Sequence, residues 1–486
     1  MIQMKKADLL ALGSVDLHRE LAVSGSYDVV VAGGGAAGLV AAVAAGRHGA
    51  RTLLVEPRSY VGGNAAVGQQ ILGTHTITGL RAVNGLPAEF LRRLKGLGAA
   101  SDAILDARIC AIVAVEPVWV KILALEMLAE AGVHVLLHSR VTDVICDGSA
   151  VCGLVMDDKR VVGCQVAIDA TGDGLVGMAA GVPHELGAGN NGLVQPATLA
   201  FRMGNVDVRR GHRQLLERGH QIFHEQFVKS LSIPVESFSP WSGSFFNANV
   251  FRQEVLAAIQ DGTLPADFPQ HRVIWWNLPA PGEAMVSMAK VTGFDCTKPD
   301  QVSAAEQEAL RLVPVLVSFL RKRIPGFEQA HLIDVAPQLG VREARRLLGD
   351  YLLTEQDVLA GAQFDDNIGL GAYYLDVHPP QGGDKTVDSM QYPLSPYGIP
   401  YRCLLPRGVD NLLVAGRCAS VTARAFGSTR VIATCMVQGQ AAGTAAAISA
   451  NLGLTPRSVP IADIQSSLRR SGVFVAAGDA DESLVF

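Results

Sequence analysis

The stretch YDVVVAGGGAAGLVAAVAAGRHGARTLLVE, at positions 27–56, decides the fold of this chain. It predicts a strand at 27–32, a glycine-rich turn, a helix of small residues at 39–49 and a second strand at 51–56. A β-α-β unit of about 30 residues is typical of a doubly wound α/β fold that binds a dinucleotide. The stretch therefore predicts a Rossmann-like domain close to the start of the sequence.

The three glycines of the turn have different physical roles. Gly33 permits the tight turn, Gly35 lets the backbone approach a pyrophosphate, and Gly38 lets the helix lie close to the strand. The helix then offers free N–H groups and the positive end of its dipole to phosphate. Glu56 ends the second strand, 18 residues after Gly38. A carboxylate there accepts hydrogen bonds from both adenosine ribose hydroxyls and repels a 2′-phosphate, which disfavours an NADP-type ligand.

A second copy of the G-x-G-x-x-G pattern shows how little the pattern means alone. Residues 187–192 read GAGNNG, but no apolar strand precedes them and no helix of small residues follows. We expect a loop there. In a chain with 51 glycines, only a copy inside a strand-turn-helix-strand unit predicts a nucleotide site.

Further segments indicate that the dinucleotide is FAD. GGN at 62–64 lets a loop pass close to a flavin ring, and IDATGDG at 168–174 is a strand that ends in a turn directed at the cofactor. NLLVAGR at 411–417 is another such strand, and the loop at 423–431 opens a helix whose dipole would face the flavin O2 and stabilise the reduced, anionic ring. The predicted cofactor-binding residues are Gly33, Gly35, Ala37, Gly38, Glu56, Pro57, Arg58, Gly63, Asn64, Val141, Thr171, Gly172, Gly416, Arg417, Arg430 and Ile432.

Two domains are expected, because 486 residues exceed what one hydrophobic core usually fills. From about residue 201 aromatic residues gather and prolines interrupt the pattern, whereas residues 411–451 restore the earlier small-residue composition. The predicted division is an extension with one short helix at 1–24, an FAD-binding domain at 25–200 and 400–455, an inserted α+β substrate domain at 201–399, and a terminal segment at 456–486.

Composition and charge exclude several classes of protein. A net charge of −5 argues against general nucleic-acid binding, which needs a clustered positive field. Acidic residues interrupt the first apolar run, which makes a poor secretory leader, and no run of about 18 uncharged apolar residues predicts a membrane span. The eight cysteines contain no C-x-x-C pair, so neither a redox pair nor a metal site is predicted. We expect a cytoplasmic protein with free thiols.

Several longer stretches resemble one known family. AIDATGDG at 167–174, GVREARRLLGDYLLTEQDVL at 340–359 and the whole segment at 411–443 are similar to the FAD-dependent oxidoreductase family. That family belongs to the glutathione-reductase-like flavoproteins and is related to the fumarate reductase flavoproteins. The resemblance runs from about residue 27 to 451. It implies a doubly wound FAD domain with an inserted substrate domain, but it names no reaction, because the substrates of the family are mostly unassigned.

Departures from related flavoproteins narrow the choice. The GDAAH turn of flavin aromatic hydroxylases is replaced by AGRCAS at 415–420, which disfavours a monooxygenase. The second nucleotide fold and the cysteine pair of disulfide reductases are missing. His75, in GTHTITG, superficially resembles the flavin-linked histidine segment of succinate dehydrogenase. It lies 19 residues beyond Glu56, too far along the chain, so non-covalent FAD is expected.

The candidate catalytic residues are few. His378, in YYLDVHPPQ, is the first candidate for proton transfer, because imidazole titrates near neutrality and two prolines fix the loop after it. Tyr373 begins the aromatic pair before it. Arg342, in GVREARR, could hold a substrate carboxylate as in fumarate-type enzymes, although the adjacent glutamate could pair with an arginine of this cluster instead. His75 could line the ring, and Trp275–Trp276 are expected to be half-buried packing residues.

Three functions follow as hypotheses. The first is an oxidoreductase that moves a hydride between FAD and a small organic substrate, since one FAD site is predicted without a partner nucleotide site or redox thiols. Its direction and electron acceptor stay open, and a homodimer is expected for an enzyme of this size. The second is a non-redox flavoprotein in which FAD is a structural or sensing ligand. The third is the flavin monooxygenase.

Overall fold

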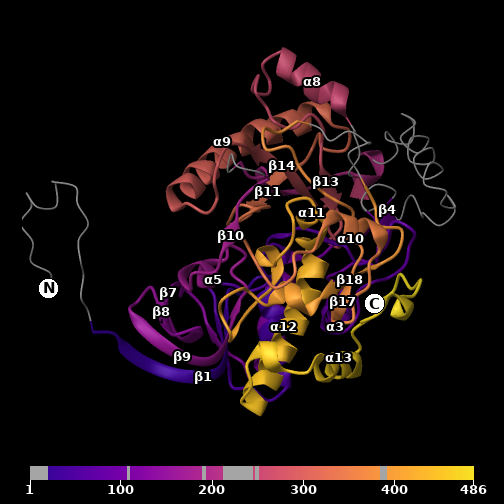
Figure 1. Ribbon diagram of the computed structural model, residues 1–486. Coiled ribbons are helices and arrows are strands. Elements are labelled where there is room, and N and C mark those ends of the chain that lie inside the picture. Colours follow the sequence, from indigo (N-terminus) through magenta and orange to yellow (C-terminus); the bar gives the residue numbers. More distant parts are fainter. Residues whose placement is uncertain (1–19, 107–109, 189–192, 212–244, 247–250, 384–390) are drawn as a thin grey trace, which may run out of the picture.

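Two sheets of different kinds organise the chain in a computed structural model (Figure 1). A mainly parallel sheet lies in the lower part of the view, and an antiparallel sheet lies above it. The structure describes residues 20–106, 110–188, 193–211, 245–246, 251–383 and 391–486.

The first sheet has the strand order β6-β2-β1-β9-β8-β7, with β19 also paired to β9. Its strands β6, β2, β1, β9 and β19 are parallel, whereas β9, β8 and β7 form an antiparallel meander. The bounds are β1 (Ala22–Ala32), β2 (Thr52–Val55), β6 (His134–Leu136), β7 (Val141–Asp147), β8 (Ala150–Met156), β9 (Arg160–Asp169) and β19 (Leu412–Val414). The predicted Rossmann-like α/β fold is confirmed.

Small residues let two helices pack closely on this sheet. Helix α2 (Ala36–Arg47) lies against α12 (Ile432–Leu452), and both are buried along almost their whole length. A side chain at Gly439 or Gly443 would collide with a backbone carbonyl of α2. Helix α12 therefore packs closely against α2. Helices α3 (Leu86–Gly96) and α4 (Pro117–Glu130) complete this layer.

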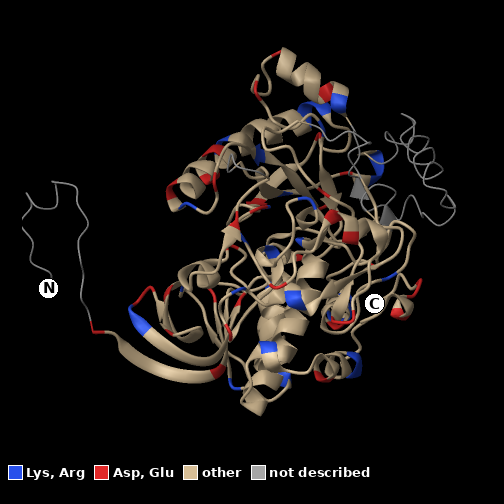
Figure 2. Ribbon diagram, viewed as in Figure 1, with Lys and Arg blue, Asp and Glu red and all other residues tan. Residues whose placement is uncertain are grey.

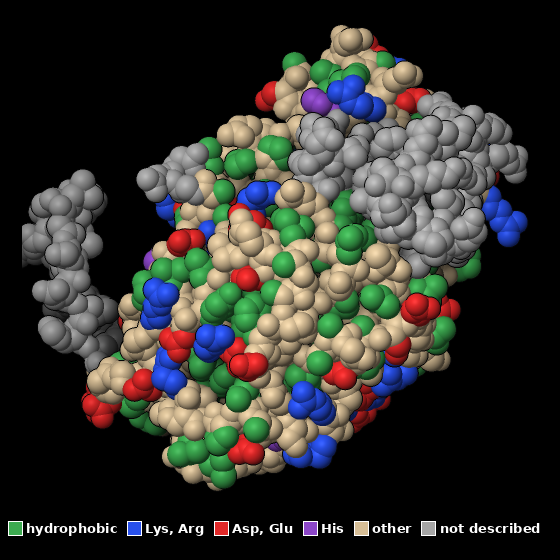
Figure 3. Space-filling view, turned by 45° about the vertical axis from the view of Figure 1, so that its right-hand side comes forward, with side chains coloured by type: hydrophobic (Ala, Val, Ile, Leu, Met, Phe, Trp, Pro, Cys, Tyr) green, Lys and Arg blue, Asp and Glu red, His purple; other side chains and the backbone are tan. Residues whose placement is uncertain are grey.

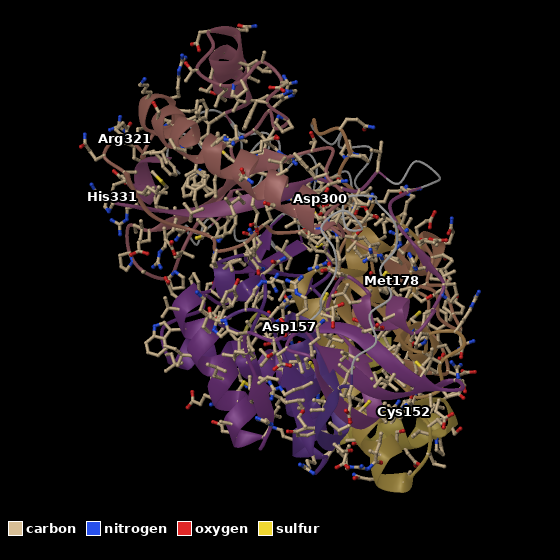
Figure 4. All side chains as sticks on the ribbon, turned by 90° about the vertical axis from the view of Figure 1, so that its left-hand side faces the viewer. Cys152, Asp157, Met178, Asp300, Arg321 and His331 are labelled. Atoms are coloured by element: carbon tan, nitrogen blue, oxygen red, sulfur yellow. The ribbon has the colours of Figure 1, made fainter. Side chains whose placement is uncertain are left out.

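The second sheet is antiparallel, with the order β12-β13-β14-β11-β15. Helix α9 (Pro299–Arg323) packs across β14 and β11, and Figure 4 labels Asp300 and Arg321 near its two ends. Helix α8 (Arg252–Gln260) lies at the top of Figure 1. The strands are β11 (Ala197–Gly204), β12 (Phe245–Phe246), β13 (Trp275–Asn277), β14 (Ala284–Val291) and β15 (His331–Val335).

Shorter elements connect the two sheets. The strands among them are β3 (Ile71–Leu72), β4 (Ile104–Asp106), β5 (Cys110–Val113), β10 (His184–Glu185), β16 (Arg346–Leu347), β17 (Asn367–Gly371) and β18 (Tyr397–Pro400). The helices are α5 (Leu175–Ala179), α10 (Glu355–Ala360), α11 (Phe426–Thr429) and α13 (Ile461–Arg470). The 3-10 turns are η1 (Ala65–Val67), η4 (Tyr401–Leu404), η5 (Gly416–Cys418), η6 (Pro456–Ser458) and η7 (Ala477–Asp479).

Each sheet has its own hydrophobic core. The core of the second sheet contains residues between Ala197 and Leu339, which is most of the predicted substrate domain. However, buried side chains from Leu353 to Ile399 pack into the core around α2 and α12. The division of the chain at residues 200 and 399 stays a prediction. The extension expected at 1–24 lies largely outside the described residues, and its last residues belong to β1.

The tryptophan pair on β13 differs from the expectation of half-buried packing. Both side chains are 1% exposed. Trp275 lies in the second core with its ring edge against Phe327, at 5.3 Å between centroids. Trp276 points to the other face of the strand and lines a cavity. Adjacent strand residues face opposite sides of a sheet, and here both sides are covered.

Charged residues of both signs are interspersed along the described ribbon (Figure 2), and their side chains are interspersed over the face shown in the space-filling view (Figure 3). Among the described residues, no helix is both long and apolar enough to cross a membrane.

Candidate cofactor and substrate cavity

The parallel strands of the first sheet direct four loops to one edge. The loops begin at Gly33 after β1, at Glu56 after β2, at Ala170 after β9 and at Ala415 after β19. Because the carboxyl ends of parallel strands meet at the same edge, these loops lie side by side. Backbone hydrogen bonds join neighbours, such as that from Ala415 N to Asp169 O at 3.0 Å.

The geometry of the glycine turn matches the role expected of each glycine. Gly33 has a φ of +96°, and a Cβ there would lie 2.6 Å from Ala170 O. A Cβ on Gly38 would collide with Gly33 O, since the helix crosses directly over the turn. Gly35 is the opposite case, because a Cβ there would meet nothing within 4 Å. Gly35 therefore presents bare backbone to an open space at the start of α2.

Glu56 is buried at the end of β2, with 3% of its surface exposed. Its Oε2 accepts a hydrogen bond from Gly34 N at 2.7 Å, and its Oε1 accepts from Arg58 N at 3.0 Å and Arg58 Nη1 at 3.1 Å. The carboxylate thus ties the strand end to the glycine turn. It also lines the cavity, and a carboxylate has further lone pairs that can accept hydrogen bonds.

The turn after β9 is organised by a buried carboxylate. Asp169 accepts from Thr171 Oγ1 at 2.7 Å, Thr171 N at 3.1 Å and Gly177 N at 3.0 Å. Burial raises the pKa of Asp169, and these hydrogen bonds oppose the rise. Gly172 has a φ of +72°, and its Cα lies against the Arg417 guanidinium. The motif at 168–174 therefore fixes Thr171 and Gly172 beside the segment after β19.

The segment after β19 leads back to α12. Gly416 N donates to Gln438 Oε1 of that helix at 2.8 Å. Arg417 is paired with Asp173 at 3.2 Å. Helix α12 begins at Ile432 without a side-chain cap, so its first N–H groups and positive dipole end face the cavity that Val431 and Ile432 line.

One cavity of about 770 Å³ brings these segments together. Of the sixteen predicted cofactor-binding residues, all except Gly38 line it, and Gly38 lies under the turn as a packing residue. Gln69 and Gln70 also line it. The residues in the cavity wall are Gly33, Gly35, Ala37, Glu56, Pro57, Arg58, Gly63, Asn64, Val141, Thr171, Gly172, Gly416, Arg417, Arg430 and Ile432.

The polar atoms of the wall fit FAD. Four lining residues carry a buried side-chain atom that has no hydrogen-bond partner within the described part of the chain: Gln70 Oε1, Gln338 Oε1, Arg417 Nε and Arg430 Nε. Buried polar atoms are normally satisfied, so these atoms indicate a polar ligand. The pyrophosphate, ribityl hydroxyls and ring heteroatoms of FAD supply both donors and acceptors. The volume lies in the range of about 300–1,000 Å³ that is typical of ligand sites.

A second region of the same cavity is lined by side chains from distant segments. We call it the arginine region, and it consists of Arg272, Arg342, Tyr373, Tyr374, Asp376, His378 and Arg430. The rings of Tyr373 and Tyr374 are tilted against each other at 4.6 Å. Asp376 accepts from Tyr374 Oη at 2.9 Å and from Arg430 Nη2 at 2.9 Å. Three of the four predicted catalytic residues therefore lie together, because Tyr373, Arg342 and His378 are in this set.

His378 is buried in the arginine region. Its Nε2 lies 3.4 Å from Asp376 Oδ1, and its backbone N donates to Gln195 Oε1 at 2.9 Å. Burial lowers the pKa of His378 well below its usual value, and the positive charges of Arg342, Lys290, Arg430 and Arg272 lower it further. The imidazole is therefore neutral at physiological pH.

The arginines of the motif at 340–349 have different environments. Arg342 lines the cavity and donates through Nη1 to Pro196 O and Thr198 Oγ1, both at 2.7 Å. Arg346 is buried in an ion pair with Glu343 at 2.7 Å. Arg345 donates to a backbone carbonyl. The pairing of the glutamate with an arginine of this cluster is confirmed for Arg346.

His75 lies apart from the predicted ring-lining position. Its ring nitrogens contact Thr74 Oγ1 and Ser483 O, each at 2.9 Å, and its ring packs edge-on against Phe486 at 5.9 Å. Burial lowers its pKa to about 4. The chain turns at Gly73, which has a φ of +86°, and the last residues of the chain cover the histidine. Its side chain is outside the cavity wall, so a catalytic role is not supported.

Several lining residues were not predicted. Thr198, Ile274 and Ser287 come from the second sheet and its approaches, and Arg272 and Asp376 come from loops. Thr198 and Ser287 each lie on a strand that is otherwise almost wholly apolar, ATLAFRMG and AMVSMAKV. A polar residue inside such a run was the feature of the sequence that could have predicted these two positions as lining residues. No feature of the sequence around Arg272 indicates that it lines the cavity.

Neither metal ligands nor disulfides were found within the described residues. There is no group of three His, Cys, Asp or Glu placed to hold a metal ion in this part of the chain. All eight cysteines are free, and Cys296 and Cys435 line the cavity. Burial raises the pKa of Cys296 to about 11 and that of Cys435 to about 12, so both are thiols at neutral pH.

The sequence matches a known family and a curated relative. The model of the family described as FAD dependent oxidoreductase matches residues 28–468. Thiamine thiazole synthase from Aeropyrum pernix is 26% identical over 248 residues, which are 48% of this chain and 82% of that protein.

Two solved structures illustrate the structural similarity. A geranylgeranyl bacteriochlorophyll reductase-like protein from Thermoplasma acidophilum is 15% identical with a TM-score of 0.42, covering 92% of this chain and 82% of that one. The p-nitrophenol 4-monooxygenase from Pseudomonas putida is 12% identical with a TM-score of 0.45, covering 91% and 84%. The family match identifies FAD as the cofactor. Kinship with glutathione reductase and fumarate reductase flavoproteins stays a prediction.

Proposed function

Because the chain belongs to the FAD dependent oxidoreductase family, we propose that it transfers a hydride between a small organic substrate and non-covalently bound FAD. The observation that carries the proposal is one continuous cavity in which the strand-end loops and the arginine region share a wall. FAD supplies the two-electron chemistry when it is bound. The residues of the chain then have to position the substrate, exclude water and move one proton.

The proposed proton acceptor is His378. A neutral imidazole accepts a proton rather than donating one, and burial beside positive charges keeps His378 neutral. Asp376 lies beside the ring and is itself held by Arg430 and Tyr374. This set favours oxidation of the substrate, since that direction releases a proton which the enzyme has to take up.

Exclusion of water is the proposed role of the aromatic wall. Tyr373 and Trp276 are each 1% exposed and Tyr374 is 3% exposed, although all three line the cavity. Burial also holds the pKa of Tyr373 well above its usual value, so its hydroxyl stays protonated and can donate a hydrogen bond. A dry pocket strengthens every polar contact made to the substrate.

The test is an anaerobic titration of the FAD-loaded protein. Alcohols, amines, amino acids and hydroxy acids are added in turn while the flavin absorbance at about 450 nm is recorded. We expect one class of donor to bleach the band within the turnover time of the enzyme. If dithionite reduces the flavin but no donor does, the non-redox hypothesis replaces the proposal. NADPH consumption that requires O2 and rises with an aromatic substrate would instead indicate a monooxygenase.

A further inference from the structure

Positive charge is concentrated around His378, on two buried and two partly buried side chains. Arg272 precedes β13, Lys290 lies on β14, and Arg342 follows β15. Arg430 joins them from the loop before α12. All four charges act on His378, and those of Arg272 and Arg430 also act on Arg342. Segments that are far apart in the sequence therefore place four cations within electrostatic reach of one imidazole.

Four carboxylates line the cavity among the residues that the structure describes. They are Glu56, Asp173, Glu306 and Asp376. The first three are engaged elsewhere, with the glycine turn, with Arg417 and with Leu339 N. Within the part of the chain that the structure describes, Asp376 is the single lining carboxylate of the arginine region, and it already binds Arg430 and Tyr374.

Arg342 differs from Arg430 in the kind of partner it has. Both hydrogen-bond acceptors of Arg342 are neutral, a carbonyl and a hydroxyl on one Nη1 atom. No carboxylate among the described residues is paired with it. A guanidinium has five N–H donors in a planar fork, so its other donors are available to an anion in the cavity. Although burial and the neighbouring arginines lower the pKa of Arg342 to about 9, it remains charged at neutral pH.

We propose that the substrate is a small organic acid whose carboxylate is bound by the Arg342 guanidinium beside Arg272, with its apolar body against Tyr373 and Ile274. This inference rests on the proposed function, because it names the substrate class of the same cavity. Two carboxylate oxygens match the planar fork of one guanidinium. A partly buried guanidinium that no described carboxylate pairs with is stabilised when the substrate supplies an anion.

Substrate binding then changes the proton affinity of His378. The carboxylate offsets part of the positive charge that disfavours imidazolium, so the imidazole accepts a proton more readily in the complex than in the free enzyme. The bound substrate acid thus makes His378 a better acceptor for the proton that oxidation of the substrate releases. A neutral substrate of the same shape would leave His378 unchanged.

Matched probes separate charge from shape. Benzoate and benzamide have nearly the same outline, but only benzoate is an anion. Each is titrated into the FAD-loaded protein by calorimetry at pH 7, and inorganic phosphate is titrated as a third probe. We expect benzoate to bind at least about 10-fold more tightly than benzamide. Calorimetry in two buffers of different ionisation enthalpy should show proton uptake with benzoate and none with benzamide.

Variants locate the carboxylate. Arg342→Gln should weaken benzoate about 10–100-fold while benzamide affinity changes less than about 3-fold, and Arg342→Lys should recover part of the loss. Arg402→Gln is the matched control, since Arg402 pairs with Asp366 outside the cavity wall, at 2.9 Å. FAD content, read from the flavin absorbance, reports whether each variant is folded.

Equal affinity for benzoate and benzamide in the wild-type protein would overturn the inference. So would Arg342-dependent binding of phosphate without binding of benzoate, because the site would then hold a different anion. The proposed function fails separately. If a neutral donor bleaches the flavin and no carboxylate binds, only the substrate class is wrong. If benzoate binding depends on Arg342 but no donor reduces the flavin, the acid site stands and the redox function fails.

Discussion

The two regions of the cavity are built by opposite means. In the nucleotide region, around Gly33, Gly35 and Glu56, the wall is mainly backbone, and one carboxylate holds the turn in shape. In the arginine region the wall is side chains carried by the second sheet and by loops. The nucleotide region therefore depends on main-chain geometry, whereas the arginine region depends on the identity of individual side chains. Substitution of a side chain should therefore change the arginine region more easily than it changes the nucleotide region.

The largest expected effect comes from breaking the nucleotide region at its tightest point. In Gly38→Val the new side chain would collide with Gly33 O, a backbone atom that cannot move without opening the turn. We expect purified protein that has lost its FAD, a loss of affinity of more than about 100-fold. Flavin absorbance after gel filtration measures it.

Gly96→Ala is the control for that experiment. Gly96 ends α3 with nothing near its Cβ position, so alanine should be neutral or stabilising by at most about 1 kcal/mol. Full FAD retention in Gly38→Val would mean that the helix does not need to cross the turn so closely, and the division between backbone and side-chain recognition would be weakened.

The second-largest effect is expected from a substitution in the arginine region. His378→Gln keeps a polar side chain of similar length but cannot take up the proton. We expect a decrease in the rate of flavin reduction of about 100–1,000-fold with FAD affinity unchanged. The wild-type rate for the free enzyme should be flat between pH 6 and 8, because the pKa of His378 lies well below 6.5. It should fall only at more acidic pH, where His378 becomes protonated.

The pH profile of the complex sharpens this prediction. Since the substrate carboxylate raises the proton affinity of His378, the acid limb of kcat should lie at higher pH than the acid limb of kcat/KM. Stopped-flow reduction at several pH values measures both. A His378→Gln variant that reduces as fast as wild type would remove His378 from the mechanism.

The two regions also differ in how far the sequence alone predicts them. The glycine turn, Glu56 and Thr171 are short-range features, because the strand, turn and acid follow one another in the chain. Their convergence follows from parallel strands ending at one edge. That logic predicted fifteen residues of the wall.

Side-chain recognition in the arginine region depends on contacts across the whole chain. Arg272 reaches the cavity only because β13 and β14 pair with Trp276 opposite Met285, a register that no local pattern specifies. The prediction that His75 lines the flavin ring does not match the structure for a related reason. Its loop turns at Gly73 and is covered by residues from the other end of the chain. Packing between segments far apart in the sequence therefore determines the positions of both Arg272 and His75.

A smaller effect is expected at the ribose end of the nucleotide region. In Glu56→Gln the amide can still accept one hydrogen bond, but its NH2 group faces backbone donors that the carboxylate accepted from. We expect FAD binding about 10-fold weaker, since one hydrogen bond to a charged group is worth about 1.5 kcal/mol. Fluorescence titration of the apoprotein measures it. Glu89→Gln is the control, because it removes partly exposed ion pairs with Arg47 and Arg93 and should leave FAD affinity unchanged.

The smallest effect belongs to His75, which is part of neither region. Its pKa is lowered to about 4 in the folded protein, so the unfolded chain binds a proton near pH 6.5 that the folded chain does not. The contribution of the neutral, buried His75 to the free energy of unfolding is therefore complete above pH 6.5. It is lost as the pH falls towards 4, because protonation then favours the unfolded chain. Between pH 7.5 and 5.5, protonation of His75 in the unfolded chain should reduce the free energy of unfolding by about 1.4 kcal/mol.

His75→Gln removes that dependence and tests whether the histidine is structural. The variant should show a shallower loss of stability on acidification than wild type, measured by urea unfolding at the two pH values. FAD affinity and the rate of flavin reduction at pH 7.5 should stay within about 2-fold, because the side chain lies outside the cavity wall. A large fall in the reduction rate with intact FAD binding would instead bring His75 into the substrate site and join the two regions through the last residues of the chain.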